Sequence, residues 1–186
     1  MNANYLKKLL SVFFIVVHLS ILSTAFAKSK SGGAIDGGGG EGLSAHYSNV
    51  VKKTFDAIKI SCKGSELTTT QTEACNFLAP YELVIQSLKV LPRSRDSILG
   101  IDGKVRDAGN DGNQSVYLDV DRWSDKLNEV DTNRISDVRA SQVRLAIHEP
   151  LILAGAEIND SYTISNIFVD LLIKNNFDFN RIVGKP

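Results

Sequence analysis

The sequence predicts an α+β domain, because helical and strand-like spacings of apolar residues occur in separate parts of it. Helical spacing occurs at residues 47–60 and again near the C-terminus, at 137–153 and 163–173. Between them, residues 88–91 and 115–121 have the short apolar patterns of strands. We therefore expect a single domain in which a small antiparallel sheet or hairpin packs with an N-terminal helix and two C-terminal helices.

The first 27 residues have the three parts of a secretory signal. Two lysines precede an apolar run at residues 9–22, and Ala25 and Ala27 are the small residues that a signal peptidase requires before the cleaved bond. The alternative is a membrane anchor, but the run is shorter than the roughly 20 residues that cross a bilayer. We expect cleavage after residue 27, a secreted or periplasmic protein, and no stable membrane insertion after the signal is removed.

Charge and length limit the classes of function that remain. The whole chain has 186 residues and a formal net charge of 0, and the signal holds two lysines and no acids, so the mature charge is −2. Because there is no basic excess, we expect no binding to nucleic acid or to an acidic membrane surface. The remaining length suits one domain with a core of its own.

Residues 28–44 have the composition of a flexible linker. Seven glycines occur among the eleven residues 32–42, and such a segment loses too much conformational entropy to fold alone. Phosphate-binding loops are also rich in glycine, but they follow a strand and carry a Lys-Ser or Lys-Thr pair, which this segment lacks. We expect a tether at 28–44 and the α+β domain at 45–186.

Cys62 and Cys75 are the two cysteines of the chain. Exported proteins meet an oxidising compartment, so the sequence predicts a disulfide between them. The alternative, a metal-binding pair, lacks further cysteine or histidine nearby.

The first half of the domain contains helices and a strand in order. Apolar residues predict the first helix at 47–60, and a second, short helix is expected from residue 72 toward 78, before Pro80. A strand at 88–91 follows, and Pro92 stops it.

Two turn-rich segments follow this strand. The glycines at both ends of residues 100–103 predict a tight hairpin over residues 98–106. Residues 107–113 are similar to a calcium-binding loop, but Gly109 and Leu118 stand at its third and twelfth positions, where oxygen ligands are needed. We expect an Asx-rich turn there.

The remaining elements are a strand and two helices. Alternating residues predict a strand at 115–121, with Asp119 and Asp121 on its polar face, either exposed to solvent or paired around a cation. Broad apolar faces predict helices at 137–153 and at 163–173.

His148 and Glu149 form the one motif that suggests chemistry. Zincin hydrolases carry His-Glu-x-x-His on a helix, where two histidines bind zinc and the glutamate activates water. Here Ile152 stands at the second histidine position. Because a catalytic zinc needs about three protein ligands, we expect His148 and Glu149 to form a structural pair and to bind no catalytic metal.

Other candidate ligands do not complete such a site in the sequence. His46, the other histidine after the signal, lies beside the expected tether. Glu157 and Asp160 are carboxylates that follow the helix. Pro150 removes a backbone donor and crowds the preceding turn, so we expect the helix to kink or break near His148.

The second half of the chain carries four motifs in order: Asp102-Gly103-Lys104-Val105-Arg106-Asp107-Ala108-Gly109-Asn110, a strand ending in Asp121-Arg122-Trp123, Leu145-Ala146-Ile147-His148-Glu149-Pro150-Leu151-Ile152-Leu153-Ala154-Gly155, and Tyr162-Thr163-Ile164-Ser165. Over roughly residues 100–166, this order resembles a group of small exported bacterial proteins of unknown function, whose helix carries His-Glu-Tyr-Leu. The resemblance implies a layout similar to a minimal zincin without its second zinc histidine. Only His148 and Glu149 carry over, and Pro150 stands where the group has an aromatic residue.

These observations favour a non-enzymatic exported domain that acts as a binding or envelope-associated module and needs no cofactor. The alternative is a zincin-like metal-dependent hydrolase, intact or degenerate, centred on His148 and Glu149. The two hypotheses differ in whether the purified protein contains zinc.

Overall fold

The computed structural model describes residues 39–64, 66–100, 102–158 and 161–184. The expected signal segment at 1–27 and residues 28–38 of the expected linker lie outside the described residues.

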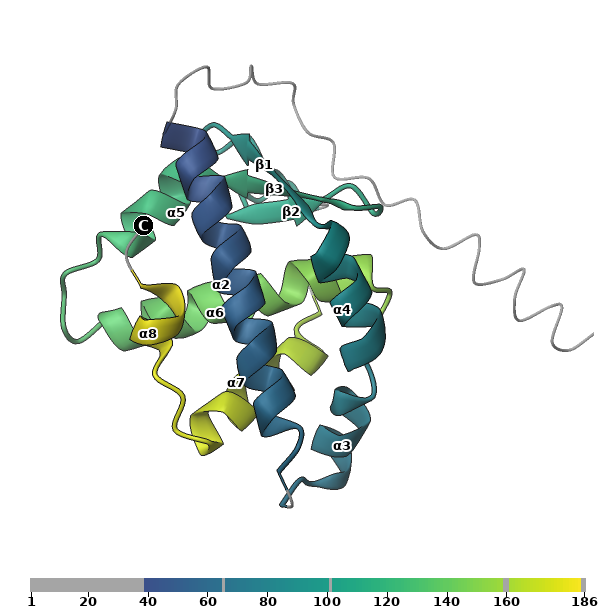
Figure 1. Ribbon diagram of the computed structural model, residues 1–186. Coiled ribbons are helices and arrows are strands. Elements are labelled where there is room, and N and C mark those ends of the chain that lie inside the picture. Colours follow the sequence, from purple (N-terminus) through teal and green to yellow (C-terminus); the bar gives the residue numbers. More distant parts are fainter. Residues whose placement is uncertain (1–38, 65, 101, 159–160, 185–186) are drawn as a thin grey trace, which may run out of the picture.

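The long helix α2, Gly39–Ser61, spans the length of the domain (Figure 1). It begins six residues before the predicted domain start, so the last part of the expected linker, residues 39–44, is helical. The reason lies in packing. Gly40 is buried, and a Cβ atom at this position would lie 3.3 Å from the Cβ atom of Pro92. A glycine therefore allows the helix to approach the sheet closely, and this contact offsets the weak helix propensity of glycine.

Two short helices stand where the sequence predicted one. They are α3, Thr69–Cys75, and α4, Leu78–Ser87. Thr68 and Gln71 form a capping box at the start of α3. Pro80 does not end a helix; it lies in the first turn of α4, where a backbone N–H has no intrahelical acceptor to lose.

The predicted disulfide between Cys62 and Cys75 is confirmed, with their Cα atoms 5.8 Å apart. It joins the residue after α2 to the end of α3, which lie side by side at one end of the domain (Figure 1).

A three-stranded sheet covers the other end of α2. Its strands are β1, Lys89–Arg93, β2, Ala108–Asn110, and β3, Ser115–Asp119, in the order β1-β3-β2. The sheet is mixed, because β1 runs parallel to β3 and β2 runs antiparallel to it. The expectation of an antiparallel sheet is therefore correct for one pair only. Pro92 lies within β1, at the edge of the sheet, where a missing N–H is tolerated.

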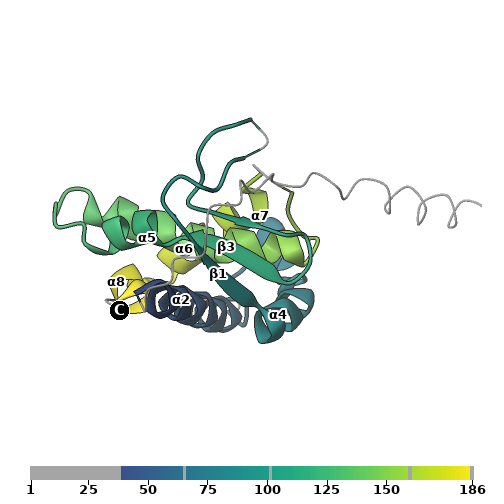
Figure 2. The same cartoon turned by 90° about the horizontal axis from the view of Figure 1, so that it is seen from above.

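The chain between β1 and β2 is a long loop that extends away from α2 and α4 (Figure 2). The hairpin predicted over residues 98–106 is reduced to a single antiparallel bridge between Leu99 and Val105. Gly103 has a φ of 77°, which suits glycine at the tip of such a turn.

The predicted strand at 115–121 ends at Asp119, because a helix that the sequence did not predict begins at Val120. This helix, α5, spans Val120–Leu127. The side chain of Asp119 accepts a hydrogen bond from the backbone N–H of Arg122, so it serves as the N-cap of α5. The alternating pattern placed Asp119 on the polar face within the strand, whereas the structure places it at the boundary between β3 and α5, as the cap of the helix.

The C-terminal half is helical, as predicted, and confirms the α+β class in a single domain. It contains α6, Ile135–Leu153, α7, Thr163–Lys174, and a short α8, Phe179–Val183. Helix α6 crosses behind α2 (Figure 1) and contacts α2, α7 and α8. The core lies between these elements and includes the fully buried Trp123, Tyr47, Tyr81 and Phe168. None of the helices in the described ranges is long and apolar enough to cross a membrane.

Candidate functional site

A cavity of about 200 Å³ lies between α6 on one side and, on the other, strand β2 and the loop that precedes it. Its polar lining comes from four parts of the chain: the loop, β2, α5 and α6. These side chains are Arg106, Asp107, Asn110, Arg122, His148 and Glu149. Tyr162, directly before α7, also lines the cavity. The tertiary fold therefore places the motif that the sequence singled out, His148 and Glu149, at a concave site.

A buried carboxylate fixes the imidazole of His148. The Nδ1 atom lies 2.7 Å from Oε2 of Glu157, and the two side chains are only 3% and 1% exposed. Glu157 also accepts hydrogen bonds from the backbone N–H and the hydroxyl of Ser165, at 2.8 and 2.6 Å. Burial by itself would raise the pKa of Glu157, but the hydrogen bonds from His148 and Ser165 outweigh it and lower the pKa.

The contacts with Ser165 assign the direction of the hydrogen bond to His148, because both oxygens of Glu157 act as acceptors there. An ionised carboxylate only accepts, so Nδ1 of His148 carries a proton and donates it. The imidazole also stacks on the ring of Tyr162, with centroids 3.8 Å apart and planes inclined by 22°. With Nδ1 engaged and one ring face covered, Nε2 is the remaining polar atom that His148 can offer to a ligand.

Glu149, the next residue of α6, is 4% exposed. Its Oε2 atom accepts a hydrogen bond of 2.9 Å from the side-chain amide of Asn110 in β2. This contact links the helix to the sheet across the cavity.

Pro150 lies inside α6, and the helix continues through it to Leu153. Of the kink or break that the sequence predicted near His148, the break is wrong. Proline leaves the carbonyl of Ala146 without its usual donor four residues later. The buried hydroxyl of Tyr81 donates to that carbonyl at 3.3 Å, and the hydroxyl of Tyr47 donates to the preceding carbonyl, of Leu145, at 3.2 Å. Tyrosines from α4 and α2 thus supply hydrogen bonds to the turn before Pro150.

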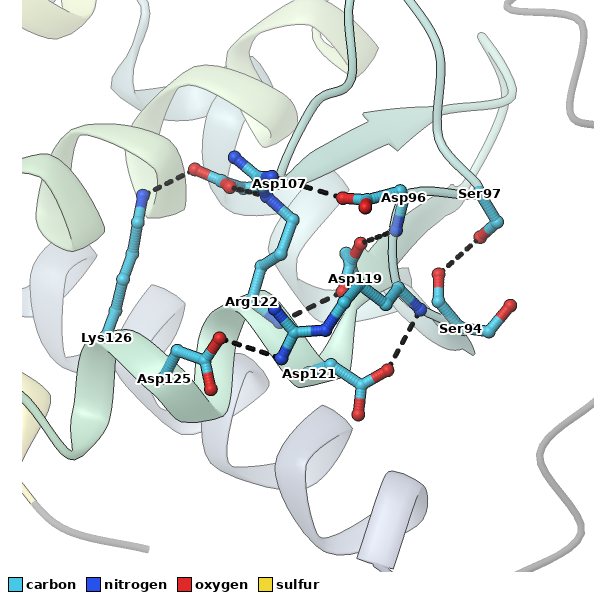
Figure 3. A network of polar contacts seen from close by, with 10 residues as sticks. Ser94, Asp96, Ser97, Asp107, Asp119, Asp121, Arg122, Asp125 and Lys126 are labelled. Atoms are coloured by element: carbon cyan, nitrogen blue, oxygen red, sulfur yellow. Dashed lines mark hydrogen bonds and ion pairs between the residues drawn. The ribbon is translucent and has the colours of Figure 1, made fainter.

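A network of charged side chains holds the loop beside the cavity (Figure 3). Asp107 accepts from Nε of Arg122 at 2.7 Å and from Nζ of Lys126, and Arg122 also donates to Asp96 at 3.2 Å. Burial would raise the pKa of Asp107, but Lys126 and Arg122 outweigh it and lower the pKa. The loop wall of the cavity is therefore anchored to α5 by charge-assisted hydrogen bonds.

Asp119 and Asp121, considered above as a cation pair, instead bind backbone amides of the loop. Oδ2 of Asp119 accepts from the N–H of Asp96 at 2.6 Å, and Asp121 accepts from the N–H of Arg95 at 2.9 Å (Figure 3). Burial raises the pKa of Asp119, and its hydrogen bonds to backbone amides oppose that rise.

The expected Asx turn within residues 107–113 is confirmed. Oδ1 of Asp111 accepts from the N–H groups of Asn113, Gln114 and Ser115. An oxygen that binds three amides closes the turn before β3 and is not directed at a cation.

His46 has a structural position within α2 rather than beside a tether. Its Nε2 atom lies 2.9 Å from the carbonyl oxygen of Val183, and its Nδ1 atom accepts from the indole N–H of Trp123 at 3.1 Å. Because both ring nitrogens are engaged, His46 joins α2, α5 and α8 and has no free nitrogen for a metal. Its pKa is lowered, chiefly by burial.

Among the described residues, the side chains around His148 do not supply the three ligands that a catalytic zinc needs. Within the described ranges, no three histidine, cysteine, aspartate or glutamate residues are grouped so that they could hold a metal ion. Glu157 bonds to the Nδ1 side of the imidazole, and Ile152 stands at the position of the second histidine. Of the two carboxylates considered, Glu157 contacts His148, and Asp160 lies outside the described residues.

Sequence reasoning identified His148, Glu149 and, as one of two carboxylates, Glu157. Asn110 and Ser165 end two of the motifs on which the resemblance rests, but no role was assigned to either, because spacing along the chain does not show which residues they contact. Hydrophobic spacing identifies the face that a helix buries, whereas these contacts depend on how β2 and α7 pack against α6.

Comparisons with known proteins identify no relative of this chain. No protein-family model matches this chain, and neither a curated protein nor a solved structure matches it. The function must therefore be argued from the site itself.

Proposed function

We propose that this protein is an exported, non-enzymatic binding domain that holds a small polar ligand in the cavity at His148 and Glu149. The observation that carries the proposal is the placement of these two side chains. Both are nearly fully buried, yet both line a cavity of about 200 Å³. Binding sites generally combine an enclosed cavity with a few convergent polar groups that orient the ligand.

The cavity is preorganised for binding. Glu157 and Tyr162 hold the imidazole of His148, and Asn110 holds Glu149, so little side-chain entropy remains to be lost when a ligand enters. The volume is below the range of about 300–1,000 Å³ that is typical of drug-sized ligands. The expected ligand is therefore small.

Export is part of the proposal. It rests on the signal-like segment at 1–27 and is supported by the disulfide between Cys62 and Cys75, which persists in an oxidising compartment.

The second candidate function is a zincin-like metal-dependent hydrolase. One observation favours it: metal-binding histidines commonly donate their other ring N–H to a carboxylate, as His148 does to Glu157. The missing ligands within the described residues weigh against it. Metal analysis of dialysed protein separates the two candidates. The binding domain is expected to hold no stoichiometric zinc, and His148→Ala should lower the thermal midpoint without changing metal content. About one zinc per chain that His148→Ala removes would favour the hydrolase instead.

Ligand binding is tested by thermal shift with a panel of free amino acids, monosaccharides and short carboxylates. Glu149→Gln keeps the shape of the side chain and replaces the carboxyl group in the cavity by an amide. Glu82→Gln is the matched control, because Glu82 forms an ion pair with Lys59 at 2.9 Å and does not line the cavity. At least one probe should stabilise the wild type and Glu82→Gln but lose its effect with Glu149→Gln. A panel without any stabilising probe, or with only effects that survive Glu149→Gln, would contradict the proposal.

A further inference from the structure

A second cavity, of about 450 Å³, continues from the first along α6. The two cavities share Asp107, Leu145 and Tyr162. The additional polar side chains of the second are Ser141, Arg144 and Asn166. Ser141, Arg144 and His148 recur at intervals of three and four residues, so they lie on the same face of α6. The Cα atoms of Arg144 and His148 are separated by four helical residues, or about 6 Å of rise.

Arg144 has no hydrogen-bond acceptor or ion-pair partner among the residues that the structure describes. Its Nε atom is buried without a partner. Other arginines near the cavities have partners: Arg122 is paired with Asp107 and Asp96, and Arg106 with Asp102. Arg144 as a whole is half-buried, but its Nε–H has lost contact with water and has no acceptor in its place, which is unfavourable for a hydrogen-bond donor.

Asp107, the acid that lines both cavities, does not compensate the charge of Arg144. Both carboxylate oxygens of Asp107 are engaged, Oδ1 with Arg122 and Oδ2 with Lys126. The second cavity therefore keeps the positive charge of Arg144.

Helix α7 adds positive potential on the opposite wall. Its N-cap residue, Tyr162, makes no side-chain capping hydrogen bond, its first turn contains no acid, and Tyr162 and Asn166 line the cavity. Glu157 accepts the amide of Ser165, which neutralises part of this potential from the buried side. The N-terminus of a helix favours an anion, and here it adds to the charge of an arginine that has no partner.

We propose that Arg144, with Ser141 and Asn166, forms a subsite for an oxyanion group, carboxylate or phosphate, and that the ligand of the neighbouring cavity is therefore a small acid. The terminal nitrogens of the guanidinium, which unlike Nε are not among the buried atoms without a partner, supply the donors that an oxyanion accepts, and the hydroxyl and amide supply further donors. The identity of the ligand rests on the proposed function, but the subsite does not, because the smallest oxyanions reach Arg144 without entering the first cavity.

The test titrates acetate and, separately, inorganic phosphate into ¹⁵N-labelled protein at constant ionic strength. The readouts are the side-chain Nε–H signal of Arg144 and the backbone amides of Ser141 and Asn166. Both anions should give saturable shifts, and the tighter of the two identifies the oxyanion. The loss of one charge-assisted contact corresponds to a weakening of about tenfold or more for Arg144→Gln. Arg144→Lys keeps the positive charge and loses the planar pair of donors. Its affinity for the anion should therefore lie between those of the wild type and Arg144→Gln.

Arg134→Gln is the matched control, because it also removes one positive charge near α6 from an arginine that is 69% exposed and lines neither cavity. Its affinity should equal that of the wild type. The subsite is refuted if neither anion gives saturable shifts, or if Arg144→Gln and Arg134→Gln behave alike.

The two proposals fail in different ways. Arg144→Gln should weaken acetate binding more than His148→Gln does, because the single carboxylate of acetate is expected to contact the guanidinium. Succinate carries a second carboxylate that can enter the neighbouring cavity, so the proposed function expects its binding to be weakened by Arg144→Gln and also by His148→Gln. If His148→Gln binds succinate as tightly as the wild type, the proposed function alone is contradicted. If Arg144→Gln binds acetate as tightly as the wild type, the subsite alone is contradicted.

Discussion

Replacing Tyr81 by phenylalanine removes the hydroxyl that donates to the carbonyl of Ala146 at 3.3 Å. Tyr81 is fully buried, so water cannot take over the role of the hydroxyl. A buried acceptor left without a partner costs about 1–3 kcal/mol. Because 3.3 Å is long for an O–H···O hydrogen bond, we expect a loss near the lower end, about 1 kcal/mol of unfolding free energy. For a domain of this size, that lowers the thermal midpoint by about 2–4 °C.

A double-mutant cycle tests whether the hydroxyl of Tyr81 compensates for the missing N–H of Pro150. Tyr81 compensates for the donor that Pro150 lacks, so Pro150→Ala restores a backbone N–H for the same carbonyl. In that background, Tyr81→Phe should lower the unfolding free energy very little, so the coupling energy between the two substitutions should be about 1 kcal/mol. Independent substitutions are additive to within about 0.3–0.5 kcal/mol, so a coupling of this size is detectable.

Tyr47→Phe provides the control for this cycle. Tyr47 donates to the carbonyl of Leu145 at 3.2 Å, and the residue four positions later, Glu149, keeps its N–H. Its cost should therefore be the same with proline or alanine at position 150. Urea unfolding can be followed by fluorescence, because the single tryptophan, Trp123, is fully buried. An equal cost of Tyr81→Phe in both backgrounds would refute the compensation.

Three further predictions follow from other parts of the molecule. N-terminal sequencing of exported protein should find Lys28 first, and a chain that starts at Met1 in the membrane fraction would contradict this. Replacing both Cys62 and Cys75 by alanine should lower the unfolding free energy by about 3 kcal/mol, since a loop with a sequence separation of 13 residues is no longer closed in the unfolded state; urea midpoints equal to those of the oxidised wild type would argue against it. The pKa of His46 is lower in the folded protein than its usual value of 6.5, so its contribution to stability is complete above pH 6.5 and is lost as the pH falls below it, because the unfolded state then binds more protons. Urea unfolding at pH 7.5 and 5.0 should therefore show a larger loss for the wild type than for His46→Gln, and equal losses would exclude this role.

Short-range patterns in the sequence were sufficient to predict the helices that bury one face. The spacing of apolar residues predicted most of α2 and the helices α6 and α7, because burial of a helical face repeats every three or four residues. Two cysteines allow a single intramolecular pairing, so the disulfide needed no structure. The aspartate-rich composition around Asp111 was enough to predict its turn.

Predictions failed where a contact with a distant segment outweighs the local preference. Glycines at 39 and 40 favour a flexible chain, but packing against Pro92 extends α2 through them. Pro150 favours a helix break, but hydroxyls from α2 and α4 bind the carbonyls before it. Intrinsic propensities amount to about 1 kcal/mol for glycine and 3 kcal/mol for proline, which tertiary packing and hydrogen bonding can exceed.

The sequence by itself determined the α+β class and the disulfide, and it singled out the two residues around which the candidate site lies, His148 and Glu149. Only the tertiary structure decided that Glu157 and Ser165 hold the imidazole, that Asn110 holds the neighbouring carboxylate, and that β1 pairs in parallel with β3. Each of these contacts joins residues from different elements. A local pattern records which face of an element is buried, whereas the partner on that face is selected only when the elements pack together and every buried polar group must find one.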